Sequence, residues 1–459
     1  MEQTQAKNTL GTRPIKPLLL SLAWPAILAN LINAFYNVVD QIFIGQGVGF
    51  LGNAATNVAF PITTICLAIG LMVGLGAASG FNLELGKNNP HNARHIAGSA
   101  VGSLLIAGVI LCVVINIWLT PLLNLFGATD QILSYAKEYT SITAFGIPFY
   151  LFSIGINPLV RADSSPTYSL LAIAAGAICN TILDPIFIFG FGMGMAGAAW
   201  ATVIGQVLSA VILALYFPRF KAVKFSMHDF IPQLDKVLTI CSLGMSSFIF
   251  QFSMLVVQIT TNLLLKNYGT ASIYGSEIPI AVAGVVAKIN TIFLAIIIGL
   301  VQGAQPIFSF NYGAQRYSRV RETLALLLKV NFAFSVICFA VFELFPQQII
   351  LIFGSGSDLY YEFAVKYMRV VLFFTFINGI QTSCSTFFAS IGKAKKGALL
   401  AFTKQLLLLV PLLIIMSSLF GLDGLIFATP ISDFCSFALA GAFLWHELKH
   451  MPATDGYIS

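Results

Sequence analysis

Long apolar runs follow one another through almost the whole chain, and no other feature limits its fold so strongly. The twelve runs lie near residues 17–44, 54–83, 96–120, 131–158, 168–190, 194–217, 237–265, 278–310, 323–350, 363–389, 397–420 and 424–447. A run of about 20 apolar residues crosses a bilayer as a helix, in which every backbone hydrogen bond is made internally. Only 9% of the residues are charged, against about a quarter in soluble proteins. The sequence therefore predicts an all-α integral membrane protein with twelve transmembrane helices.

The basic residues predict the orientation of these helices. Seventeen of the 24 Lys and Arg residues fall in the termini and in the loops that would share their side of the membrane. The opposite side would hold only Lys137, Lys266, Lys366 and Arg369. Because cytoplasmic loops carry the excess of positive charge, we expect a multi-pass protein of the cell membrane with both termini cytoplasmic. This distribution also explains the net charge of +6 without a nucleic-acid partner.

The two halves of the chain repeat with a constant offset of 227 residues. The matching pairs are Phe126-Gly127 with Phe353-Gly354, Gly86 with Gly313, Arg94 with Arg321, Gly197 with Gly424 and Thr202 with Thr429. Since each half holds an even number of spans, both should have the same orientation, as in a parallel internal repeat. We expect an N-terminal six-helix lobe over residues 1–217, a cytoplasmic linker over 218–236 and a C-terminal six-helix lobe over 237–459.

Only three of the 18 acidic residues lie well inside apolar runs: Asp40, Asp184 and Asp433. A carboxylate at membrane depth must be protonated, paired or bound to a cation, and is a functional candidate by default. At about 1.5 Å per residue, Asp40, Asp184 and two polar side chains of neighbouring spans lie about 6 to 12 Å from the outer ends of their helices. The first lobe is thus predicted to hold a site for a shared proton or a sodium ion, formed by Asp40, Asn180, Asp184, Thr202, Tyr36 and Tyr139. We expect no cofactor besides this coupling ion, H⁺ or Na⁺, and no structural metal.

The internal repeat supports a functional interpretation of these acids. Asn180 and Asp184 correspond to Leu407 and Pro411 in the second half, so the second copy keeps the fold without the polar groups. Scaffold polarity should recur in both copies. The alternative, that the Asn and Asp side chains only join helices by hydrogen bonds, stays open.

Further polar side chains inside spans are candidates for a substrate cavity. Asn33 and Asn37 share a helical face with Asp40, and Lys288 is expected to face the central cavity. Asp433 could bind a cationic substrate or pair with an inward lysine. Lys329 and Lys404 are expected to extend to the cytoplasmic surface. Pro25, in the first span, is either a bending point or a static kink.

Some patterns are better explained without chemistry. The sequence His446-Glu447-Leu448-Lys449-His450 fits a zinc-protease motif, but it lies where the last span meets the cytoplasm, so an interfacial anchor is the simpler interpretation. The seven cysteines all lie in apolar runs without a CxxC pair, as small apolar residues do.

Taken together, the twelve spans in two similar halves, Pro25 and Asp40, the Asn180/Asp184 pair and Thr202 resemble the MATE (multidrug and toxic compound extrusion) transporters. Gly45-Gln46-Gly47, Arg161-Ala162-Asp163 and Asp433 resemble the MepA branch of that family.

The resemblance implies a V-shaped, non-enzymatic transporter that exports cationic amphipathic drugs in exchange for H⁺ or Na⁺. It also implies a first-lobe cation site at Asp40, Asn180, Asp184 and Thr202, bending of the first span at its proline, and drug or cation near Asn157 and Tyr139. The tenth-span acid of another MATE branch is missing between Val370 and Ile391, so coupling should rest on the first lobe. We expect a monomer in the lipid bilayer. A lipid-linked sugar flippase of the same superfamily is the alternative function; an intramembrane enzyme or a passive channel fits the residues less well.

Overall fold

The computed structural model describes residues 9–275, 277–352 and 357–456, and within these ranges the secondary structure is helical. The predicted pair Phe353-Gly354 lies outside the described residues. The helices of the first half are α1 (Thr9–Thr12), α2 (Ile15–Gly47), α3 (Phe50–Gly86), α4 (Pro90–Ile117), α5 (Leu119–Leu125), α6 (Asp130–Ala162), α7 (Pro166–Pro185), the π-helix η2 (Ile186–Gly190) and α8 (Gly194–Ala214). The short 3₁₀-helices η3 (Phe217–Arg219) and η4 (Met227–Phe230) follow.

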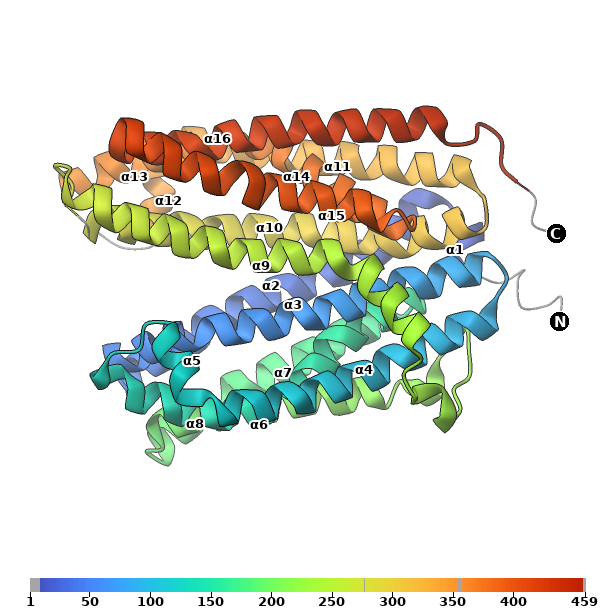
Figure 1. Cartoon of the computed structure of the whole chain (residues 1–459), viewed down its shortest axis with the longest axis horizontal. Helices are drawn as coiled ribbons and strands as arrows, with labels where there is room; N and C mark the ends of the chain where they lie inside the picture. Colours follow the sequence, from blue (N-terminus) through green and yellow to red (C-terminus); the bar gives the residue numbers. More distant parts are fainter. Residues whose placement is uncertain (1–8, 276, 353–356, 457–459) are drawn as a thin grey trace.

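The second half repeats this plan with irregular helices near its end. Its elements are α9 (Leu234–Thr270), α10 (Glu277–Gly313), α11 (Tyr317–Leu344), α12 (Pro346–Ile352), α13 (Asp358–Val371), α14 (Thr375–Ser390), α15 (Ala394–Phe402), the π-helix η5 (Thr403–Leu409) and α16 (Val410–His450). Figure 1 shows α2–α8 as one lobe and α9–α16 as the other, with α1 and the end of α16 at the same end of the molecule. We call this the terminal end.

These helices make twelve membrane spans within the described ranges, as predicted. Nine single helices are long and apolar enough to cross a bilayer, and α13 with α14 forms a tenth span that is bent by 45°. The helical run Ala394–His450 has 57 residues, or about 85 Å, more than twice the thickness of a hydrocarbon core. It is interrupted at Gly421, where φ is 60° and ψ is −136°, so it supplies the last two spans.

The lobes meet through glycines near the terminal end. A Cβ atom at Gly303 of α10 would lie 2.4 Å from Ala23 Cα of α2, and one at Gly244 of α9 would lie 1.8 Å from the Met72 carbonyl oxygen of α3. The side chain of Asn30 on α2 also donates a hydrogen bond of 3.3 Å to Gln302 of α10. Only glycine permits such close backbone contact, so the first half of α2 is clamped against the second lobe.

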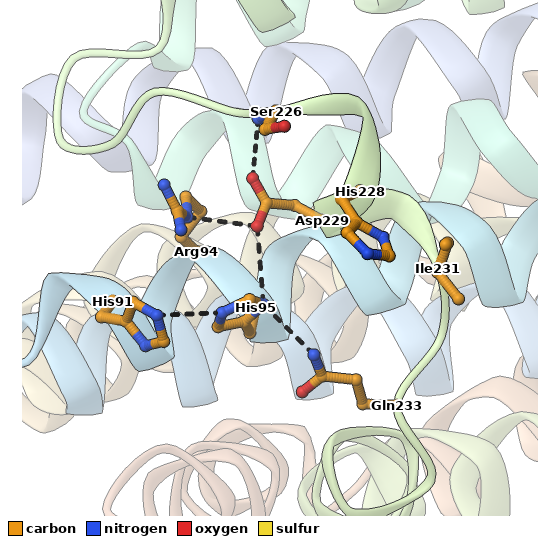
Figure 2. A pocket seen from close by; sticks show the side chains of 8 residues that line it. All are labelled: His91, Arg94, His95, Ser226, His228, Asp229, Ile231 and Gln233. Carbon is orange, nitrogen blue, oxygen red and sulfur yellow. Dashed lines mark hydrogen bonds and ion pairs between the residues drawn. The ribbon is translucent and has the colours of Figure 1, made fainter.

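The segment that joins the lobes is fastened to the first lobe (Figure 2). Asp229 of η4 is buried and lies 3.2 Å from Arg94 Nε and 3.5 Å from His95 Nδ1, both on α4, while its second oxygen accepts a bond from the Ser226 amide. Asp163, after α6, accepts bonds from the Tyr216 hydroxyl and two further backbone amides of the segment. A change in the angle between the lobes must therefore occur after this segment, near the start of α9.

Candidate functional site

Two aspartates from different helices meet inside the first lobe. Asp40 of α2 is 7% exposed and Asp184 of α7 is fully buried, and their carboxyl groups lie within interaction distance of each other. Asp40 Oδ1 and Asp184 Oδ2 find no hydrogen-bond donor among the described residues. Two buried carboxylates this close cannot both stay charged and unpaired, so the arrangement requires a shared proton or a bound cation.

Asn180 and Thr202 complete the polar groups around this pair. The Asn180 amide nitrogen lies 3.5 Å from Asp184 Oδ1 and 3.3 Å from Thr202 Oγ1, to which it can donate. The Asn180 carbonyl oxygen is buried and accepts no bond from a described residue. The cluster thus offers oxygen atoms only, which suits H⁺ or a hard cation such as Na⁺.

Two tyrosines lie beside the carboxylates. Tyr36 of α2 and Tyr139 of α6 are both close enough to Asp40 and Asp184 for electrostatic interaction, and Tyr139 also interacts with Thr202. All six residues predicted for the cation site are therefore near one another. We call them the cation cluster: Tyr36, Asp40, Tyr139, Asn180, Asp184 and Thr202.

Local sequence explains how α7 presents its part of the cation cluster. A Cβ at Gly205 of α8 would lie 2.7 Å from the Gly176 carbonyl oxygen of α7, so these glycines let the two helices approach and bring Asn180 to Thr202. Asp184 is followed by Pro185, which has no amide hydrogen, and the span ends as the π-helix η2. Such π-helical turns are rare and frequently lie at functional sites.

The other polar residues predicted on α2 and α10 lie apart from the cation cluster. Asn33 and Asn37 are exposed, and the Asn37 amide donates a 2.7 Å bond to the Asn33 carbonyl of its own helix. Lys288 on α10 is exposed as well. These side chains are free to meet a substrate between the lobes, whereas Asp40, at the end of the same stripe, turns into the first lobe.

The structure corrects the placement of Asn157. This residue is only 3% exposed. Its oxygen accepts bonds from Arg161 Nη1 at 2.5 Å and Ser169 Oγ at 2.8 Å, and its nitrogen donates to the Ser169 carbonyl at 2.9 Å. Asn157 thus fastens α6 to α7 inside the lobe and does not line the predicted substrate cavity.

The second lobe holds a buried ion pair. Asp433 of α16 lies 3.2 Å from Lys404 Nζ of η5, and both side chains are less than 10% exposed. Lys404 also contacts the Asn378 side-chain oxygen of α14. The expectation that Lys404 extends to the membrane surface is wrong, because the side chain turns inward to these partners. Of the two alternatives for Asp433, the structure shows the inward lysine.

Glu447, in the zinc-protease pattern, has a structural role. It is 2% exposed and pairs with Lys393 and, at 2.8 Å, with Lys396. The flanking rings of His446 and His450 stack with centroids 4.2 Å apart. These contacts fix the end of α16 against the start of α15.

Comparisons with known proteins agree with this geometry. The family model described as MatE matches residues 25–186 and 247–415. The multidrug export protein MepA of Staphylococcus haemolyticus is 23% identical over 95% of this chain and 94% of its own length, and MepA of Staphylococcus aureus strain MSSA476 is 24% identical over 96% of both.

Solved structures show the same fold. The MATE multidrug transporter DinF-BH, solved in complex with a drug, is 32% identical, covers 95% of this chain and 97% of its own, and superposes with a TM-score of 0.88. A MATE protein in complex with MaL6 is 22% identical over 96% of this chain and 97% of its own, also with a TM-score of 0.88. Since the family model covers most of both halves, the chain belongs to the MatE family of MATE transporters.

Proposed function

We propose that this protein is an ion-coupled multidrug exporter, which moves cationic amphipathic compounds out of the cell in exchange for H⁺ or Na⁺. The observation that carries the proposal is the buried Asp40–Asp184 pair, whose unpartnered oxygens call for a cation. The relatives' names support the substrate class: the MepA proteins are named multidrug export proteins, and DinF-BH, a multidrug transporter, was solved with a drug bound.

The helices that carry the two aspartates suggest how ion binding changes the protein. Asp40 lies on the half of α2 beyond the clamp at Asn30, where Asn33 and Phe35 are exposed. A proton or Na⁺ between Asp40 and Asp184 removes the repulsion between the carboxylates and draws α2 toward α7. Loss of the ion releases α2. Ion and drug then stabilise opposite arrangements of the lobes, which is the requirement for exchange.

The energy available per ion is sufficient for efflux. One charge that crosses a potential of 100 mV supplies about 2.3 kcal/mol, equivalent to somewhat under two decades of drug gradient. The ion must enter from outside. With both termini in the cytoplasm, as the basic residues predict, the glycine contacts close the cytoplasmic end of the lobes. The exposed Asn33 and Asn37 then lie toward the outside.

Ethidium efflux from proteoliposomes tests the proposal. The purified protein should move ethidium against its gradient when either a proton or a sodium gradient is imposed, and the effective gradient names the coupling ion. Folded protein that moves no drug under either gradient would contradict the proposal. Labelled lipid-linked sugars would then test the flippase, for which no contact among the described residues speaks.

A further inference from the structure

The buried Lys404–Asp433 pair lies near the middle of the membrane. Lys404 is ten residues beyond Ala394, at which its span begins, and thus about 15 Å deep. Asp433 is twelve residues beyond the break at Gly421, which gives a depth of about 18 Å from the opposite face. Charges this deep are costly and are kept mainly where they serve ion or substrate movement.

Irregular helices surround the pair. Lys404 belongs to the π-helix η5, and Ser432 on α16 donates a 3.0 Å bond to its backbone carbonyl. Asn378, the second partner of the lysine, follows the 45° break between α13 and α14. Interrupted helices that meet at the midplane are the usual setting of ion and substrate sites in transporters with internal repeats.

The lobes differ in how their buried acids are neutralised. In the cation cluster, Asp40 and Asp184 have no basic partner among the described residues, so the neutralising cation must come from outside the protein. In the second lobe, the charge that acts on Asp433 is that of Lys404. The ammonium group of the lysine thus does for Asp433 what a coupling ion would do for the first-lobe pair.

We propose that Lys404 is a tethered cation that fills the second lobe's ion position and thereby limits coupling to the first lobe. This inference rests on the proposed ion-coupled function. If the lysine is made neutral, Asp433 is left buried and unpaired, and it must take up a proton or a sodium ion. The variant should then carry one more coupling ion per cycle than the natural protein.

The test is the drug gradient at which net transport stops, measured in proteoliposomes with fixed ion gradients. Lys404→Gln should need a balancing drug gradient about tenfold larger per imposed pH unit than the natural protein, or per decade of sodium gradient if Na⁺ is the ion. The double variant Lys404→Gln/Asp433→Asn should return to the natural value. Lys329→Gln removes an exposed lysine of the same lobe and should change nothing. An active Lys404→Gln protein with an unchanged balance point would overturn the proposal.

A second readout does not need transport. Infrared spectra of folded Lys404→Gln should show how Asp433 is neutralised: the carbonyl band of a protonated carboxylic acid, or a carboxylate band that shifts when Na⁺ replaces K⁺. Either signal should disappear in the double variant. A carboxylate indifferent to both pH and Na⁺ would contradict the proposal. If instead the natural protein moves no drug under any gradient while this signal appears, the proposed function fails and the tethered cation does not.

Discussion

At the scale of single residues, the cation cluster is a set of buried oxygens that the protein does not satisfy by itself. Asp40 Oδ1, Asp184 Oδ2 and Asn180 Oδ1 all lack a donor among the described residues. Each such atom costs about 1 to 3 kcal/mol when left unpaired. The cost is removed when a proton or cation binds, so the cluster favours the uptake of one.

Thr202 tests the contribution of a single neutral group. In Thr202→Val the Asn180 amide loses an acceptor 3.3 Å away, and the amide no longer has a fixed orientation toward Asp184. A lost hydrogen bond of this kind costs about 1 kcal/mol, so the apparent affinity for the coupling ion should fall about fivefold. Efflux measured as a function of pH and of Na⁺ concentration gives this affinity. Thr239→Val, which removes an exposed hydroxyl bonded within α9, should leave it unchanged; equal losses in both variants would contradict the assignment.

At the scale of elements, α2 has two halves with different partners. Its first half packs on α10 through Ala23 and Gly303, and its second half carries Asp40 toward α7. Pro25 lies in the clamped half and leaves the carbonyl oxygen of Ser21 without its helical donor. A hinge here lets the second half of α2 move while the contact between the lobes is kept.

Pro25→Ala should therefore reduce transport without removing the ion site. The substitution restores a backbone hydrogen bond and stiffens α2, so we expect efflux to fall several-fold while the ion still protects the protein against thermal unfolding. The matched control is Pro61→Ala, at another buried proline inside a first-lobe helix. A Pro25→Ala protein with natural efflux would show that the proline is a static kink.

Sequence patterns predict the elements well where they depend on length and hydropathy, and poorly where helices deviate from α geometry. The twelve spans follow from apolar runs, and the meeting of Asp40 with Asp184 follows from their similar depth. The π-helix at Thr403–Leu409 has no sequence signal, so the sequence alone places Lys404 at the surface. Asn157 and Arg161 are one helical turn apart, a spacing that could have indicated their mutual bond.

At the scale of the whole molecule, two lobes of one architecture differ in their chemistry. The first lobe has the cation cluster and holds the joining segment through Asp163 and Asp229. The second has an ion pair closed on itself. An exporter built in this way binds its coupling ion on one side of the central axis, and the other lobe serves as the rigid body against which the first one moves.

The orientation of the lobes can be tested by cysteine labelling. Met227 in the joining segment is 87% exposed, and Ile273 between α9 and α10 is 75% exposed. In a protein whose exposed Cys435 is replaced by serine, an impermeant maleimide should label Ile273→Cys on intact cells and Met227→Cys only after permeabilisation. The reverse pattern would contradict cytoplasmic termini.

The central claim is that the Asp40–Asp184 pair holds the coupling ion. Its most direct test is gradient-driven ethidium efflux by Asp184→Asn, compared with Asp423→Asn, which neutralises a carboxylate that is 57% exposed and paired with Lys366. We predict that Asp184→Asn folds, reaches the membrane and loses gradient-driven efflux, while Asp423→Asn keeps it. Natural efflux by Asp184→Asn under the same gradient would contradict the account.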